Sequence, residues 1–207
     1  MAHGVCPWWL GYFLLSPIRR LWQDPRAILA PYVEEGQTVL EPGPGMGFFT
    51  LELARLVGRA GRVVAIERQP EMLRRLRRRA QRAGLLERIE TRLAAASDLG
   101  AGDLAGKIQF VLAFAVVHEL PNVNAFFAQV GSVLAPGGIL LMAEPRGHVS
   151  EAEFQRTLAS AAAAGLRISS RPTIGRSRAA LLARSRGGDG TGVPEDAGPP
   201  SSYREPS

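Results

Sequence analysis

The chain alternates short apolar segments with longer amphipathic segments from residue 38 to residue 165, and this alternation constrains the fold more than any other feature. The apolar segments are rich in β-branched residues, which favour strands. Strands are predicted at 38–40, 62–66, 89–93, 108–117 and 139–143. Helices are predicted at 48–57, in the arginine-rich stretch after residue 67, at 124–134 and at 150–164. This order predicts an α/β fold, a doubly wound parallel sheet with helices on both faces.

The first predicted strand leads into a turn that contains Gly43, Gly45 and Gly47 and that opens with Glu41. Glycines let the backbone adopt positive φ and approach a ligand closely. The amino terminus of the next helix points at the same place, which favours ligand binding there. A dinucleotide fingerprint requires Gly-x-Gly-x-x-Gly, and its third glycine would fall on Phe48. The spacing therefore argues against a dinucleotide.

Two acidic residues follow the next two strands, at the carboxyl ends where sheets of this kind bind ligands. Glu67 ends the second strand, where a carboxylate can accept both hydroxyls of a ribose. The alternative is an exposed glutamate at a strand end. Asp98 follows the third strand and either bonds an adenine amino group or caps a turn. Both acids are candidates for cofactor binding.

Three motifs in this order and spacing resemble the class I S-adenosylmethionine (SAM)-dependent methyltransferases, in particular the group of quinone-biosynthesis C-methyltransferases and arsenite methyltransferases. They are Val-Leu-Glu-x-Gly-x-Gly-x-Gly at 39–47, Val-Ala-Ile-Glu at 64–67 and Leu-Ala-Pro-Gly-Gly at 134–138. The resemblance covers residues 29–183. It implies a Rossmann-like, seven-stranded, mostly parallel sheet with an antiparallel last strand, and two short segments at 166–169 and 179–183 supply the remaining strands.

The resemblance also implies which residues bind SAM. The glycines of the turn lie under the methionine part, Glu67 holds the ribose and Asp98 meets the adenine. Glu41 opens the first motif where the family commonly has Asp, and Gln109 stands where the family often has Asp at the start of the fourth strand.

In this family the end of the fourth strand, here at 114–122, faces the methyl donor and the acceptor. His118 has the chemistry of a base near neutral pH, and the alternative is a structural histidine that bonds a loop carbonyl. Glu119 either orients His118 or is exposed. Glu144 ends the fifth strand, His148 follows it, and both are candidates for lining the acceptor pocket.

The segments outside the motifs divide the chain into three parts. Residues 1–31 are predicted to form a helical leader that acts as a lid, with ordinary packing as the alternative for its aromatic side chains Trp8, Trp9, Tyr12 and Phe13. Residues 32–186 are the predicted SAM-binding domain. Residues 187–207 are rich in Gly, Pro and Ser and predict a disordered tail. The apolar run at 5–15 is too short to cross a bilayer, although its tryptophans suit weak contact with a membrane surface.

The net charge of +6 is concentrated between residues 68 and 88, a segment that contains eight arginines and only two glutamates. Leucines and alanines recur there at helical spacing, so the arginines are predicted to form a solvated helix face. A phosphate-binding face is the alternative, but no RNA-binding motif accompanies it. The turn resembles that of the rRNA adenine dimethyltransferases, yet residues 115–118 lack the clamp for a flipped base. Nucleic acid is therefore not the predicted acceptor.

The single cysteine, Cys6, excludes a disulfide framework and a cysteine metal site, and it predicts a reducing, cytoplasmic setting. It also argues against arsenite methylation, which needs several thiols. Catechol-type methyltransferases hold a metal with clustered carboxylates at the end of the fourth strand. Residues 115–117 supply no carboxylates there, so no metal is predicted.

The sequence thus predicts a SAM-dependent methyltransferase with a small-molecule acceptor. The alternatives are an RNA-directed methyltransferase and a non-catalytic SAM-binding protein. Neither the acceptor nor the oligomeric state follows from the sequence.

Overall fold

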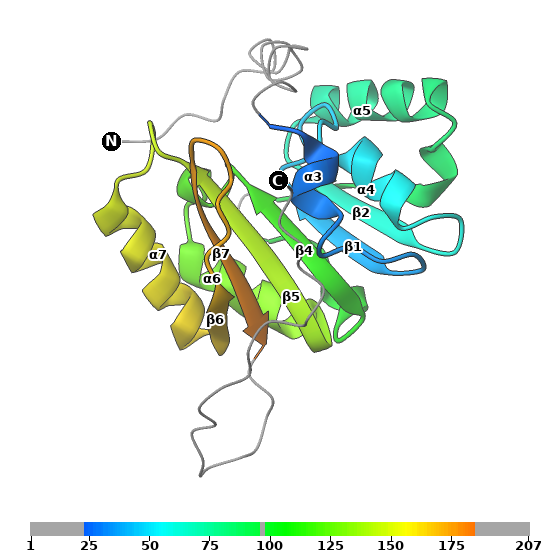
Figure 1. The fold of residues 1–207 in the computed structure, drawn as a ribbon. Coiled ribbons are helices and arrows are strands. Elements are labelled where there is room, and N and C mark those ends of the chain that lie inside the picture. The colour runs from blue at the N-terminus through cyan, green and yellow to red at the C-terminus, as the bar shows by residue number, and fades with distance from the viewer. Residues whose placement is uncertain (1–22, 96–97, 185–207) are drawn as a thin grey trace, which may run out of the picture.

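Seven strands form one sheet in the computed structural model, which describes residues 23–95 and 98–184 (Figure 1). The strands are β1 (Thr38–Pro42), β2 (Arg62–Glu67), β3 (Ile89–Leu93), β4 (Ile108–Phe114), β5 (Leu134–Pro145), β6 (Leu166–Ser170) and β7 (Ser177–Arg184). Their order across the sheet is β3-β2-β1-β4-β5-β7-β6. Strands β1 to β5 pair in parallel, and β7 runs antiparallel to both β5 and β6. The predicted fold class is confirmed.

Helices cover both faces of the sheet (Figure 1). The α-helices are α3 (Pro25–Leu29), α4 (Thr50–Leu56), α5 (Pro70–Arg82), α6 (Val123–Val133) and α7 (Glu151–Ala163). Short 3₁₀ segments are η2 (Leu86–Arg88), η3 (Gly102–Leu104) and η4 (Val117–Glu119). One buried cluster joins the sheet to α3, α4 and α5, and a second joins it to α6 and α7. Neighbours on β1 divide between them, since Val39 belongs to the first cluster and Leu40 to the second.

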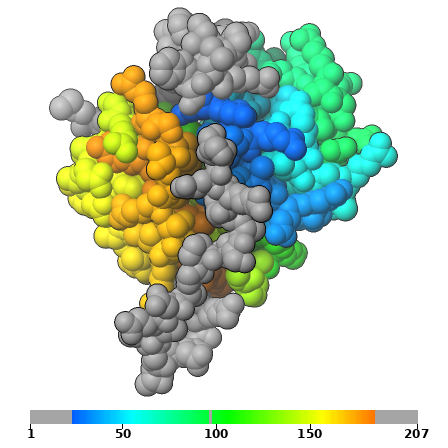
Figure 2. All heavy atoms as spheres, in the orientation of Figure 1, coloured from blue at the N-terminus to red at the C-terminus, as the bar shows by residue number. Residues whose placement is uncertain are grey.

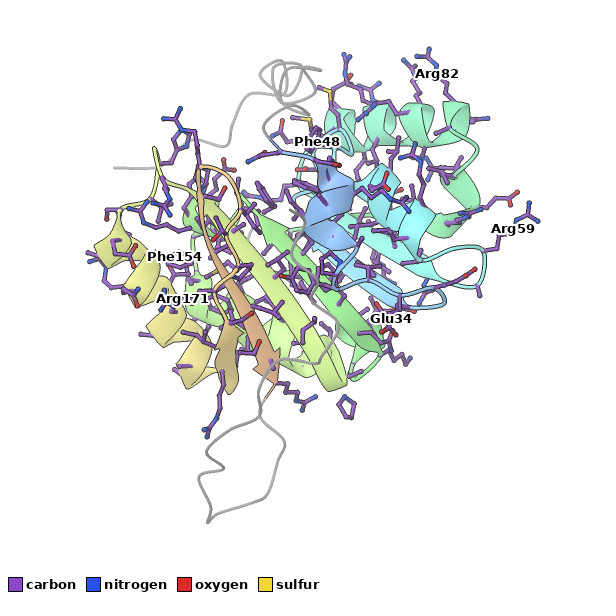
Figure 3. All side chains as sticks on the ribbon, viewed as in Figure 1. Glu34, Phe48, Arg59, Arg82, Phe154 and Arg171 are labelled. Carbon is purple, nitrogen blue, oxygen red and sulfur yellow. The ribbon has the colours of Figure 1, made fainter. Side chains whose placement is uncertain are left out.

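Local sequence signals explain where the helices begin and which face they bury. Ser150 and Glu153 form a capping box at the start of α7, and Phe154 points from that helix towards the sheet (Figure 3). On α5 the buried positions are Met72, Leu73, Leu76 and Ala80. Arg82 extends from the same helix away from the sheet (Figure 3), as expected for a solvated arginine face.

Strand β4 ends at Phe114, three residues earlier than predicted. Ala115 has a φ of 55°, in the left-handed region, and its N–H donates to the carbonyl oxygen of Ala143 at 2.8 Å. The apolar run continues, but the chain turns into η4. The composition of the run did not reveal this change of direction.

Strand β5 begins at Leu134, five residues before the predicted start at residue 139. The pairing with β4 shifts there, because Ile108 pairs with Leu134 whereas Phe110 pairs with Ile139. A Cβ on Gly138 would lie 2.7 Å from the carbonyl oxygen of Ile108. The Pro-Gly-Gly segment is therefore an irregular part of the strand that brings the two backbones close together.

The ends of the chain are described only in part. Leu29 of α3 is fully buried in the cluster that includes α4, and the α3 segment (blue) lies between the cyan and orange regions of the surface in Figure 2. The rest of the predicted leader, including the four aromatic residues named above, and the predicted tail lie outside the described residues. The lid and the disordered tail stay predictions. Among the described residues no helix is long and apolar enough to cross a membrane.

Candidate active site

A cleft of about 470 Å³ opens at the carboxyl ends of β1, β2 and β4. It lies at the point where the strand order reverses, since β1 leads to β2 on one side and pairs with β4 on the other. Crevices at such switch points are the usual ligand sites of open α/β sheets. Seven residues were predicted for the cofactor and the base, and six of them line this cleft. The exception is Gly47.

The three glycines of the turn after β1 all have positive φ, but their surroundings differ. A Cβ on Gly43 would lie 2.7 Å from Cγ2 of Val116. A Cβ on Gly47 would overlap Cδ1 of Leu76 and lie 3.0 Å from Cδ1 of Leu51. A Cβ on Gly45 would meet no protein atom within 4 Å. Packing within the protein thus accounts for Gly43 and Gly47, whereas Gly45 borders the open space of the cleft.

Glu67 supports this turn from the end of β2. Its Oε2 accepts the N–H of Gly45 at 3.1 Å, and its Oε1 accepts the N–H groups of Arg68 at 2.7 Å and Gln69 at 3.1 Å. The residue is 9% exposed and lines the cleft. Sequence reasoning placed Glu67 at the ligand but missed that its carboxylate also fixes Gly45.

Glu41 is a buried carboxylate in the cleft wall, 3% exposed. Its Oε2 has no hydrogen-bond partner among the described residues. Burial raises the pKa of Glu41 to about 8; Thr50 opposes this shift and the nearby charge of Glu67 adds to it. Because Oε2 of Glu41 has no partner among the described residues, it remains available to a ligand that carries a donor or a positive charge.

Asp98 lies at the exposed edge of the cleft. Its Oδ1 accepts the N–H of Gly100 at 2.8 Å, which is the turn cap that the sequence offered as one alternative. The second carboxylate oxygen leaves capacity for a ligand, since an ionised carboxylate has about four lone-pair sites.

At the other end of the cleft, Glu144 lies beneath His118. Its Oε2 bonds Nδ1 of His118, and its Oε1 accepts the N–H of Val117 at 2.8 Å. Glu144 is only 1% exposed, so it supports the cleft wall from behind, whereas His148 lines the cleft as predicted. The rings of His118 and His148 meet edge to face, with centroids 5.8 Å apart. Glu119 also lines the cleft, and Glu144 takes the orienting position that the sequence offered to Glu119.

The charges around His118 shift two pKa values. The hydrogen bond between His118 and the Glu144 carboxylate raises the pKa of His118 above its ordinary value. Burial opposes this shift, and the charges of Glu144 and Glu119 add to it. Burial also raises the pKa of the Glu119 carboxyl, with the positive charge of His118 opposing. Both shifts favour the protonated forms of the two side chains at this end of the cleft.

The cleft is acidic although the chain is basic. Its lining carboxylates belong to Glu41, Glu67, Asp98 and Glu119, while Arg68 is its only arginine or lysine among the described residues. The chain as a whole carries +6. A carboxylate-lined cleft suits a cationic or zwitterionic ligand better than a polyphosphate. Within residues 23–95 and 98–184, no group of three or more His, Cys, Asp or Glu side chains is arranged to hold a metal.

The sheet, the glycine turn and the cleft at the switch point define an α/β domain built to bind a small ligand. The chain belongs to the methyltransferase domain family, whose model matches residues 33–173. The family resemblance predicted from the motifs is thus confirmed.

Individual relatives agree with this family. The chain is 31% identical over 115 residues to the arsenite methyltransferase of Halobacterium salinarum, covering 56% of this chain and 28% of that one. It is 29% identical over 128 residues to the ubiquinone/menaquinone biosynthesis C-methyltransferase UbiE of Brucella canis, covering 61% and 47%. The chain thus spans less than half the length of these curated relatives. A SAM-dependent methyltransferase structure from Aquifex aeolicus superposes with a TM-score of 0.76 at 25% identity, covering 86% of this chain and 98% of that one.

Proposed function

We propose that this protein is a SAM-dependent methyltransferase that acts on a small-molecule acceptor. The observation that carries the proposal is the open space beside Gly45, which is bordered by carboxylates in an otherwise basic protein. SAM combines a cationic sulfonium, a ribose and an adenine, so it matches an acidic cleft with hydrogen-bond acceptors. The methyltransferase domain family and the structural likeness to the Aquifex aeolicus enzyme support the same cofactor.

The cofactor-binding roles are assigned to the residues that line this half of the cleft. The turn with Gly43 and Gly45 forms the floor, and Gly47 keeps that turn in place by letting Leu76 pack against it. Glu67 accepts the ribose hydroxyls with the lone pairs that its backbone partners leave unused. Glu41 offers its unpaired oxygen to the cofactor, whose positive charge would favour ionisation of this otherwise protonated carboxyl, and Asp98 accepts from the adenine amino group.

The acceptor-binding half contains His118, which we assign as the base. SAM supplies a methyl group on a good leaving group, so the protein has mainly to hold the acceptor in line and receive its proton. His118 lines the cleft just after β4, and the apolar side chains of Phe114 and Leu120 also line the cleft. These apolar walls exclude water from the place where the acceptor is held.

A small acceptor fits the size of the cleft, since about 470 Å³ must serve both ligands. The curated relatives are named for arsenite and for quinone biosynthesis. With one cysteine in the chain, the quinone-like class is the better match. Four of the arginines, Arg74, Arg77, Arg78 and Arg82, are exposed on α5 and lie outside the cleft lining, so RNA remains the weaker candidate. The single cysteine also fits a reducing, cytoplasmic setting.

The test is isothermal titration with SAM followed by a donor-coupled screen of acceptor metabolites. We expect one SAM per chain and turnover with at least one small acceptor. SAM binding without turnover on any small molecule or RNA would instead indicate the non-catalytic SAM-binding protein. Turnover on RNA alone would indicate the RNA-directed enzyme.

A further inference from the structure

We infer that Glu144 is a positioning residue that makes His118 a proton acceptor, and that the acceptor molecule therefore carries a proton on the atom that is methylated. The inference deepens the proposed function, on which its second part rests. Glu144 touches neither ligand, because it lies behind the wall of the cleft and acts through His118.

The Glu144 carboxylate makes two separate contacts. Oε1 accepts the N–H of Val117, and Oε2 bonds the imidazole of the next residue, His118. One buried side chain on β5 thus fixes both the backbone of η4 and the ring that η4 presents to the cleft. A carboxylate that is 1% exposed is held by these partners and has little freedom to move.

The contact with Glu144 determines which ring nitrogen carries the proton in neutral His118. An ionised carboxylate only accepts hydrogen bonds, so Nδ1 must donate to Glu144. The neutral ring then has no hydrogen on Nε2, the nitrogen that remains for a ligand in the cleft. A histidine whose Nδ1–H is held by a buried carboxylate is a well-attested form of general base.

Three titratable side chains face His118. They are Glu144 on β5, Glu119 on η4, and His148 in the loop after β5. Glu119 and Glu144 both favour the protonated ring, and the hydrogen bond from Glu144 is the largest influence. His118 therefore accepts a proton readily, and it acts as a base only when the pH is high enough for the neutral ring to form.

The proton balance identifies the acceptor class. The bond between the acceptor atom and its hydrogen breaks, and the proton passes to Nε2 of His118. The electron pair of the acceptor atom forms the bond to the methyl carbon, and the pair of the broken C–S bond stays on sulfur. The positive charge that leaves the sulfonium is thereby matched by the charge on the imidazolium, which Glu144 stabilises. A hydroxyl or amine needs this help, whereas a thiolate or an acceptor that is already ionised does not.

The direct test is ¹⁵N NMR of the histidine rings in the full chain without ligands, comparing the wild type with Glu144→Gln. The glutamine oxygen can still accept from Val117, but its NH₂ group would donate to Nδ1 of His118 and force the proton onto Nε2. We expect the Nδ1–H tautomer in the wild type and the Nε2–H tautomer, with a lower His118 pKa, in the variant. The chain has three histidines, so the variants His3→Gln and His148→Gln together assign the His118 signals by elimination.

Glu52→Gln is the matched control. Glu52 is also largely buried and paired with arginines, but it lies on α4 outside the cleft lining. We expect its variant to show the His118 tautomer and pKa of the wild type. If Glu144→Gln does not fold, the tautomer of the wild type alone decides, and an Nε2–H ring there overturns the inference.

The kinetic readout tests the acceptor class once a substrate is found. Glu144→Gln should lower kcat by about 10²-fold or more, the range for loss of a general base, and leave SAM affinity unchanged. The wild-type rate should rise with pH through the raised His118 pKa, and the variant should lose this limb. An unchanged kcat and pH profile overturn the inference while leaving the methyltransferase proposal intact. A tautomer change as expected, with no turnover on any acceptor, contradicts the proposed function instead.

Discussion

The two turns that border the cleft shape it in opposite ways. The turn after β1 omits side chains, because Gly43, Gly45 and Gly47 bring bare backbone to the cleft and to its supporting core. The turn after β4 supplies a side chain, His118, and holds it with the buried carboxylate of Glu144. The cofactor half thus depends on space and on backbone conformation, whereas the acceptor half depends on one ionisable group and its support.

This difference predicts that substitutions in the two turns will change different measurements. A side chain added after β1 should change affinity or stability and leave the chemistry of any bound complex alone. A side chain removed after β4 should change the rate and leave cofactor binding alone. The following variants test this division, from the largest expected effect to the smallest.

Removal of the imidazole should give the largest effect. His118→Ala is expected to lower kcat by about 10²–10⁴-fold, because a general base acts only in the transition state. SAM affinity by calorimetry should stay close to that of the wild type. Full turnover with an unchanged pH profile would remove His118 from the mechanism.

Gly47→Ala should destabilise the fold, because its Cβ overlaps Leu76. We expect a loss of about 2–5 kcal/mol in urea unfolding, from left-handed backbone strain together with overpacking. Gly36→Ala is the control, since Gly36 also has a positive φ but its Cβ would meet nothing within 4 Å. It should lose only the strain of about 1–2 kcal/mol. Equal losses in the two variants would show that packing does not require Gly47.

Glu67→Ala is expected to weaken SAM binding by roughly 1–3 kcal/mol, the range for hydrogen bonds to a charged group. S-adenosylhomocysteine should weaken by a similar amount, because the two molecules share the ribose. The loss includes the support of Gly45, whose N–H the carboxylate accepts. An effect on SAM alone would place Glu67 near the sulfonium and contradict the assignment.

Per pH unit, Glu41 should give the smallest effect, a pH dependence of stability in the protein without ligand. Its pKa is raised from 4.5 to about 8, so the native state binds more protons than the unfolded state between these values. Stability should therefore fall as pH rises through this window, by about 1.4 kcal/mol per unit. Glu41→Gln should remove this contribution, whereas the contributions from His118 and Glu119, whose pKa values are also raised and which have the same sign, remain. Parallel stability curves for the two proteins would contradict the raised pKa.

Most of the fold could be predicted from the sequence, as could the position of the proposed cofactor residues at one edge of the sheet. Alternating strands and helices determine the sheet, and parallel strands bring Glu41, Glu67 and the glycines to one edge. The separate reasons for Gly43 and Gly47 could not be predicted, because they depend on Val116 and Leu76 in distant elements. The His118–Glu144 pair was missed for a similar reason. It needs the β4–β5 register together with the left-handed turn at Ala115, and neither is visible in composition or spacing.

The central claim is that the open space beside Gly45 is where SAM binds, and calorimetry on Gly45→Val tests it most directly. Gly36→Val is the control for a branched side chain at positive φ outside the cleft. We predict that the wild type and Gly36→Val bind one SAM per chain, whereas folded Gly45→Val shows no detectable binding and a melting temperature similar to that of the control. Wild-type SAM affinity in Gly45→Val would contradict the account.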